Sequence, residues 1–274
     1  MLLKPGDKGD AVKDLQRALN KLGSLLLVDG GFGSGTEAAV ADARVALGRP
    51  GPPQADDDLQ NALAGLSDPS PDLTAPGVTF IGRLEVSGPA EYRQRYRHPV
   101  WPSATSGITI GIGYDLRFAN EAKLRADWGA VLPADTIAPL VPVLNRVGSN
   151  ELLATVADVD VPLPAAITVF LSQMMPENVG KTRAAYPQLD NLPPARRTAL
   201  ISLVFNRGND LEGDRRREMK RIRELLDTGD LDAVADQFES MKRLWDPVKE
   251  RGLIERRQQE AILWRDGFAA LQLD

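Results

Sequence analysis

The chain has 274 residues, enough for one large domain or two modest ones, and its 43% hydrophobic and 26% charged residues are ordinary for a globular protein. A net charge of −5 does not suggest the basic surface that nucleic-acid binding requires. The absence of cysteine excludes disulfides, thiol nucleophiles and thiolate metal sites. With His98 as the single histidine, a serine–histidine triad or a histidine metal centre has little support, and we expect no metal and no cofactor.

The first ten residues, MLLKPGDKGD, lack the apolar core of a secretory signal. No window approaches the roughly 18 consecutive apolar residues of a membrane span. We therefore expect a monomer that is made in the cytoplasm without a signal peptide, does not insert stably into a membrane, and reaches any target outside by another route.

The N-terminal stretch predicts three short helices around a small core. Val12, Leu15, Leu19 and Leu22 share one helical face, and Gly23 is placed to end that helix. A glycine-rich loop then leads into a second helical stretch that carries Ala39, Val40 and Ala43, and DDDLQNALAGL supplies a third. Each helix is short, so each must bury its apolar face against the other two.

The loop before the second helix holds an Asp–Gly turn, Asp29 and Gly30, followed by Phe32 and Thr36. Together, GDKGDAVKDLQRALNKLG and VDGGFGSGTEAAV resemble the peptidoglycan-binding domain family of three-helix modules. The resemblance implies that Asp29, Gly30, Phe32 and Thr36 take part in binding the bacterial wall. The chain departs from the family at ADARVA, where an aromatic residue and Gln usually follow Ala-Val and form part of the pocket wall.

A stretch dense in Pro, Ser, Asp and Gly, GLSDPSPDLTAPG, follows at 65–77. Each of its three prolines biases the residue before it away from helix. We therefore predict a peptidoglycan-binding three-helix domain at 1–66, a linker at 67–77 and a catalytic domain at 78–274.

The larger part begins with a helical run in which Val78, Ile81 and Leu84 are spaced as one face, and Glu85 comes just before a Ser-Gly-Pro stop. A carboxylate at the C-terminal end of a helix faces the negative end of the helix dipole, which disfavours its charged form. Partial burial acts in the same direction and suits a general acid. Most glutamates at helix ends are simply solvated, so Glu85 alone decides nothing.

The segment SGITIGIGYDL, at 106–116, alternates isoleucines with Thr109, Gly111, Gly113 and Asp115, which is typical of a half-buried strand. Thr109 and Asp115 share a face, but a fully extended strand would hold them roughly 20 Å apart. Glycines permit a bend or bulge, so we expect the chain to fold back and bring Asp115 towards Thr109. The alternative is that Asp115 only caps a helix beginning near Leu116.

Glu85, the segment TIGIGYDL, and the later stretches ARRTALISLVFNRG and GLIERRQQEAILW together resemble the phage-type lysozymes, helical muramidases that cleave peptidoglycan glycan chains. Phage enzymes usually carry a catalytic Asp six residues before the threonine, where this chain has Ser103. The bacteriocin pesticin and its relatives carry that Asp six residues after the threonine, the place of Asp115, so the pesticin-like branch fits better.

The resemblance implies catalytic roles for Glu85, Thr109 and Asp115 and contacts with substrate from Tyr114. It places Asn206, near the end of a helix that starts after Pro193 and stops at Gly208, along the substrate cleft. It also matches Arg256 with an arginine that pairs with the catalytic glutamate, with Arg257 as the alternative if the register is off by one.

A basic run, DRRREMKRIRELLD at 214–227, has two interpretations. Contact with acidic wall polymers or lipid headgroups is one, and a solvated helix face whose arginines are opposed by Glu218 and Glu224 is the other. We favour the second.

The sequence therefore predicts a mainly α protein: a three-helix wall-binding domain and an α+β lysozyme-like domain with one small β-hairpin region. The expected activity is hydrolysis of the β-1,4 bond between N-acetylmuramic acid and N-acetylglucosamine, as in a phage endolysin, with peptidoglycan as partner. Inverting chemistry would require the two carboxyl groups to lie about 6.5–9.5 Å apart. A lytic transglycosylase, a delivered antibacterial effector or bacteriocin, and a non-catalytic wall-binding protein are the alternatives.

Overall fold

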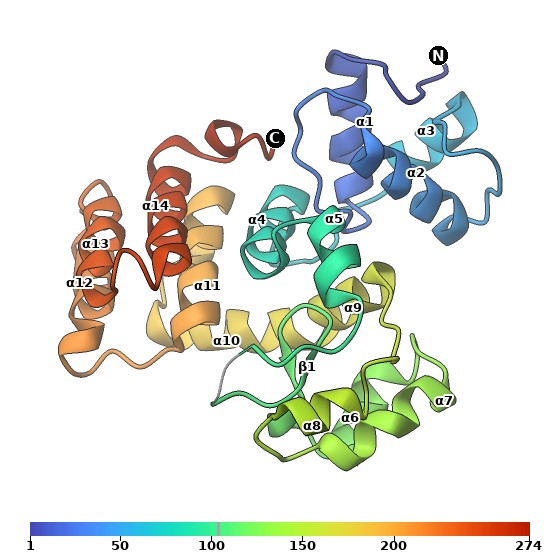
Figure 1. The fold of residues 1–274 in the computed structure, drawn as a ribbon. Helices are drawn as coiled ribbons and strands as arrows, with labels where there is room; N and C mark the ends of the chain where they lie inside the picture. Colours follow the sequence, from blue (N-terminus) through green and yellow to red (C-terminus); the bar gives the residue numbers. More distant parts are fainter. Residues whose placement is uncertain (103–104) are drawn as a thin grey trace. The chain divides into compact units, whose positions relative to one another are not determined.

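The structure, a computed structural model, describes residues 1–102 and 105–274. It is mainly α, and the described residues form one small antiparallel sheet (Figure 1), as expected from the sequence. Contacts between residues divide the chain into two compact units, each assembled from segments that are not continuous in sequence. The first unit comprises Met1–Leu26, Gly30–Ser67 and Gly82–Met175, and the second comprises Leu27–Asp29, Asp68–Ile81 and Pro176–Asp274.

The first unit contains α1 (Asp10–Asn20), α2 (Ser34–Ala46), α3 (Asp57–Ala64), α5 (Pro89–Glu91), the π-helical turn η1 (Tyr92–Tyr96), β1 (Thr109–Ile110), β2 (Tyr114–Asp115), the 3-10 helix η2 (Leu116–Phe118), α6 (Glu121–Trp128), α7 (Ala134–Ile137), η3 (Ala138–Val143), α8 (Asn150–Ala154), α9 (Leu163–Val169) and η4 (Phe170–Met174). Helix α4 (Ala75–Val86) contributes its last turn to this unit and its first two turns to the other.

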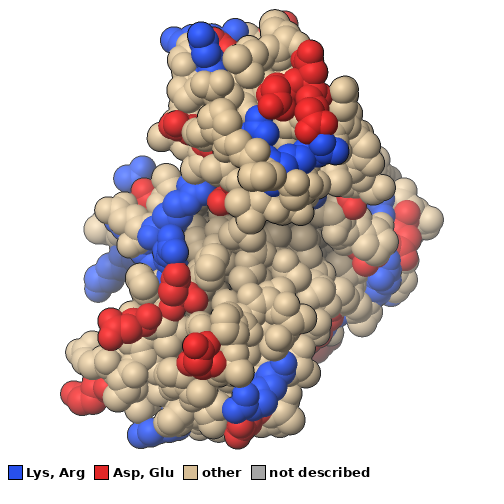
Figure 2. Space-filling view, turned by 90° about the vertical axis from the view of Figure 1, so that its right-hand side faces the viewer, with Lys and Arg blue, Asp and Glu red and all other residues tan. Residues whose placement is uncertain are grey.

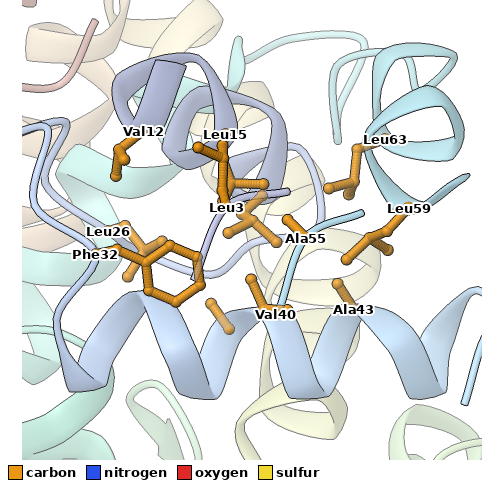
Figure 3. Close-up of a cluster of buried hydrophobic side chains, with 12 residues drawn as sticks. Leu3, Val12, Leu15, Leu26, Phe32, Val40, Ala43, Ala55, Leu59 and Leu63 are labelled. Atoms are coloured by element: carbon orange, nitrogen blue, oxygen red, sulfur yellow. The ribbon is translucent and has the colours of Figure 1, made fainter. Parts of the chain in front are cut away.

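The N-terminal bundle, residues 1–66, has its own core (Figure 3). Val12, Leu15 and Leu19 of α1 are buried as the helical spacing predicted, and they meet Val40 of α2 and Leu59 of α3. Helix α1 ends at Asn20, and Gly23, in the turn that follows, has a φ of 76°, a left-handed conformation that favours glycine. The side chain of Asp56 caps α3 by accepting a hydrogen bond from the Leu59 amide. The bundle therefore forms for the reasons visible in its sequence.

Within the first unit, Leu25, which follows α1, makes a close contact between the N-terminal bundle and α4. Leu25 is fully buried with a φ of 56°, a left-handed conformation that is unfavourable for a residue with a side chain. A Cβ added at Gly82 of α4 would lie 2.7 Å from Leu25 Cδ2, so only glycine leaves room for this leucine. Arg83 Nη1, next along α4, donates to the Leu25 carbonyl at 2.9 Å.

Two further contacts within the first unit join the N-terminal bundle to later segments. A Cβ added at Gly23 would lie 2.4 Å from Ile167 Cγ2 of α9, so the backbone of the bundle is in direct contact with this side chain. Arg93 of η1 donates to Asp42 of α2 at 3.0 Å. The bundle is thus packed against the rest of this unit as well as joined to it along the chain.

The second unit contains α10 (Met175–Ala185), η5 (Leu189–Asn191), α11 (Pro194–Arg207), η6 (Asp214–Arg216), α12 (Arg217–Thr228), α13 (Val234–Ser240), η7 (Met241–Leu244), α14 (Arg251–Asp266) and η8 (Ala269–Leu271). Helix α14 packs on α11 and α13, and α12 packs on α13 (Figure 1). Helix α11 begins after Pro193 and ends at Gly208, as its sequence indicated.

The segment predicted as a linker is held by specific bonds inside the second unit. Asp68 accepts from the Ala75 amide at 3.0 Å at the start of α4, and Leu73 is buried. Asp72 pairs with Arg183 of α10. The domain limits 1–66, 67–77 and 78–274 stay predictions, but much of residues 67–77 packs as folded chain.

The face shown in Figure 2 carries acidic and basic side chains in small separate groups, with no continuous patch of one sign. This distribution agrees with a modest net charge of −5. None of the helices formed by residues 1–102 and 105–274 combines the length and the apolar character that a membrane crossing requires.

Candidate functional site

Glu85 lies in the last turn of α4, which ends at Val86. The chain then turns sharply, because Ser87 and Gly88 have φ angles of 60° and 127°. Ser87 is a non-glycine residue in the left-handed region, and such local strain often accompanies functional sites. The Glu85 side chain is half-buried, and its Oε2 lies 3.8 Å from the position of a Cβ added at Gly113. The helix end therefore presents this carboxylate to the segment singled out in the sequence.

Gly111 and Gly113 form the turn of a hairpin between β1 and β2. Both have positive φ angles, 60° and 75°, so the chain reverses where the sequence predicted a bend. A Cβ at Gly111 would lie 2.8 Å from Trp128 Cη2, so this position excludes side chains for lack of space as well. At Gly113, by contrast, the added atom meets only the Glu85 oxygen and Met174 Cε, both at nearly 4 Å.

Thr109 and Asp115 are directly paired across this hairpin. Residues directly opposite in an antiparallel pair have Cβ atoms about 4.5–5.5 Å apart on one face of the sheet. The expectation that Asp115 is brought to Thr109 is therefore confirmed. The backbone of Thr109 is also bonded on its other side to Val100, at 2.8 and 2.9 Å, which fixes its position.

The Asp115 carboxylate also acts as a cap. It accepts hydrogen bonds from the Arg117 amide at 2.8 Å and from the Gly107 amide at 3.1 Å, at the start of η2. This is the capping role that the sequence left open as an alternative. Asp115 remains half-exposed, so the cap orients a carboxylate that solvent still reaches. Its catalytic role and its separation from Glu85 stay predictions.

Tyr114 was expected to contact substrate, but the structure places it in the interior. Its hydroxyl donates to Asp127 Oδ2 at 2.7 Å, and its ring packs edge-on against Trp128 at 5.5 Å. Burial, followed by the hydrogen bond to Asp127, raises the pKa of this phenol far above its usual value. Tyr114 therefore supports the hairpin from inside, because its alternation along β2 points it to the opposite face from Asp115. Ser103, the position of the missing carboxylate, lies outside the described residues.

Arg256 belongs to the second unit, and its expected pairing with Glu85 stays a prediction. Its side chain is buried and donates to the Ser202 carbonyl at 3.0 Å and to Glu260 at 3.4 Å. Arg257 is fully buried, donating to Glu260 at 2.8 Å and to Asn206 Oδ1 at 3.4 Å. Both arginines are thus anchored on one buried carboxylate.

Asn206 is exposed at the end of α11, where it lines a pocket of about 530 Å³ in the second unit. Arg207, Arg215, Arg216 and Trp245 also line this pocket, and we call it the arginine pocket. The sequence predicted Asn206 as a cleft residue but not these neighbours. The basic run contained a signal for two of them, whereas nothing in the sequence marked Trp245.

The four residues expected to bind the wall divide into one exposed and three buried. Phe32 is enclosed by the bundle core (Figure 3). Thr36 is buried, where it donates to the Gly31 carbonyl and accepts from Gln16, each at 3.2 Å. Gly30 is buried with a φ of 76°, which the Asp–Gly turn requires. Asp29 is the one exposed residue of the four, so a direct contact with polymer is expected first at Asp29. The wall-binding roles of all four residues stay predictions.

The bundle with its Asp–Gly turn can be compared with known families. Residues 8–47 match the model of a putative peptidoglycan-binding domain. This match covers α1, the Asp–Gly turn and α2, and it supports peptidoglycan as the partner of the N-terminal bundle. No curated protein matches the chain.

Proposed function

We propose that the chain is a peptidoglycan hydrolase that cleaves the β-1,4 bond between N-acetylmuramic acid and N-acetylglucosamine. The observation that carries this proposal is the placement of Glu85, at a helix end, against the turn of a hairpin that pairs Thr109 with Asp115. The match to a peptidoglycan-binding domain supports the polymer as substrate.

In the proposed reaction, Glu85 protonates the glycosidic oxygen as the bond from the anomeric carbon to that oxygen breaks. A water held by the Thr109 hydroxyl attacks the opposite face of the sugar, and Asp115 accepts its proton. This arrangement inverts the anomeric configuration, which requires room for a water between the two carboxyl groups. The amides of Gly107 and Arg117 would keep the Asp115 carboxylate in place throughout.

The N-terminal bundle would hold the enzyme on its polymer. A wall-bound catalytic site meets its substrate at high effective concentration, so modest affinity suffices. A phage endolysin and a delivered antibacterial effector or bacteriocin share this chemistry and differ only in how they reach the wall.

Mass spectrometry of the fragments released from purified peptidoglycan tests the proposal. The wild-type chain should release sugars with reducing ends, whereas a lytic transglycosylase releases anhydro-sugars. Glu85→Gln should lower the rate at least about a hundredfold through loss of the general acid. Glu91→Gln, at the end of α5, where the carboxylate pairs with Arg95 at 3.3 Å, serves as the control and should keep the wild-type rate. Absence of any fragments from the wild-type chain would instead indicate a non-catalytic wall-binding protein.

A further inference from the structure

The arginine pocket is lined by an unusual concentration of cations. It lies where the end of α11 meets η6, and three of its lining residues are Arg207, Arg215 and Arg216. Among the residues that the structure describes, none of these three forms an ion pair with a carboxylate. The volume of about 530 Å³ is ample for a charged group of a larger ligand.

The acidic residues at the pocket are already neutralised by other cations. Glu212 pairs with Lys220 at 3.5 Å, and Asp214 pairs with Arg243 at 3.1 Å. The pocket therefore keeps a surplus of positive charge despite the two carboxylates in its lining.

The crowding of positive charge affects Arg207 in particular. Burial, and after it the charges of Arg216 and Arg215, lower the pKa of Arg207 to about 10. The Arg207 guanidinium lies over the Trp245 ring at 5.1 Å and donates to the Arg215 carbonyl, so it is held in place against the repulsion. An anion between these guanidinium groups would relieve that repulsion.

The rest of the basic run shows the opposite arrangement. Arg217 pairs with Glu218, Arg221 with Glu224, and Arg223 with Asp227. These are the solvated helix-face pairs that the sequence suggested. The structure thus separates the run into arginines whose charge is matched and the two, Arg215 and Arg216, that face the pocket.

We propose that the arginine pocket is a binding site for an anionic group of the wall polymer, a carboxylate or a phosphate. Planar guanidinium groups match both kinds of oxyanion with paired N–H donors. The exposed Asn206 amide adds a further donor at the rim. This inference rests on the proposed action on peptidoglycan only for the source of the anion.

The first test needs no wall polymer. Inorganic phosphate should raise the thermal midpoint of the full chain above its value in chloride of equal ionic strength. Arg215→Gln/Arg216→Gln should abolish most of this rise. The control variant Arg221→Gln/Arg265→Gln removes the same charge from exposed arginines that pair with Glu224 and with Asp236 and Glu239. It should keep the rise. Without phosphate, the pocket variant should be at least as stable as the wild type, because like charges have been removed. An equal response of the two variants, or a destabilised pocket variant, would overturn the site.

The second test identifies the source of the anion, with Glu85→Gln in every chain to prevent breakdown of the polymer. At about 50 mM salt, the pocket variant should bind purified walls about tenfold more weakly than the control variant. This difference in affinity, the gap between the two variants, should disappear near 500 mM salt. If removing phosphate polymers from the walls closes the gap, the ligand is a phosphate. If removing the stem peptides closes it, the ligand is a carboxylate. A gap that survives both treatments contradicts an anion site, whatever the fate of the proposed hydrolysis.

Discussion

The hairpin of β1 and β2, whose turn lies against Glu85, and the N-terminal bundle both contain a glycine-rich motif, but the polar residues of the two regions differ in exposure. In the bundle, Phe32 and Thr36 are buried and their contacts are internal, so the motif builds the fold. At the hairpin, the glycines build the turn, while Asp115 of β2 and Glu85 of the neighbouring α4 stay half-exposed. A motif match alone does not say which of its residues meet a ligand, and burial makes that distinction.

The first prediction tests the hairpin side of this comparison, at its second carboxylate. Asp115→Asn should lower glycan cleavage by at least about tenfold without changing the thermal midpoint, because the amide oxygen still accepts the Arg117 N–H but cannot take a proton. Asp135→Asn, an exposed change on α7, is the control. Full activity of Asp115→Asn would reduce this residue to a helix cap and leave Glu85 and Thr109 to carry the site.

A double-mutant cycle tests whether the N-terminal bundle is energetically coupled to α4, the helix that carries Glu85. Leu25→Ala should cost about 2–4 kcal/mol of unfolding free energy as a buried cavity, and Gly82→Ala about 1–3 kcal/mol through overpacking. Because the second change fills space that the first creates, the double variant should lose less than the sum by at least about 1 kcal/mol.

Leu63→Ala gives the matched control for this cycle, since Leu63 is buried in the bundle core. Combined with Gly82→Ala, it should be additive within about 0.5 kcal/mol. Equal coupling in both cycles, measured by denaturant unfolding, would show that Leu25 has no special contact with α4.

Within the hairpin, the two glycines should differ in their tolerance. Gly111→Ala combines a left-handed backbone with a collision against Trp128 and should cost about 2–4 kcal/mol. Gly113→Ala meets no atom closer than 3.8 Å and should cost about 1 kcal/mol from the backbone alone. Thermal unfolding of the two variants decides the order, and a reversed order would contradict this account of the turn.

The smallest effects concern the bundle motif. Thr36→Val should cost about 1–2 kcal/mol, because it removes the buried hydroxyl that bonds to Gly31 and Gln16, yet wall retention of the folded protein should be unchanged. Asp29→Asn should change stability by less than about 0.5 kcal/mol and lower wall retention about twofold. A loss of retention confined to Thr36→Val would reverse the assignment of exposed and internal roles.

Local patterns in the sequence predicted the helices and the hairpin because each depends on neighbouring residues. The stripe of Val12, Leu15 and Leu19, the stop after Glu85 and the bend at Gly111 are examples. Contacts between distant segments were not predictable. Asp72 meets Arg183 more than a hundred residues away, which is why a proline-rich stretch that suggested a free linker is partly fixed in place.

In the candidate site, too, features set by neighbouring residues were predictable and contacts between distant segments were not. Sequence reasoning placed Glu85 and paired Thr109 with Asp115, because helix ends and hairpins are local. It did not foresee the burial of Tyr114, which depends on Asp127 and Trp128 from α6. It also missed the cluster of Arg207 with Trp245, because a pocket formed by residues nearly forty positions apart leaves no pattern in the chain.

The leucine held at Gly82 has a consequence for protein engineering. Exchanging one part of a chain for a foreign part assumes that it can be cut away and replaced at the connecting segment. Here the segments before and after residues 67–77 are fitted to each other, because Leu25 and Gly23 on one side fit Gly82 and Ile167 on the other. A chimera with a foreign bundle would need a side chain that fills the space at Gly82 as Leu25 does. Without it, α4, the helix that carries Glu85, would lose this support.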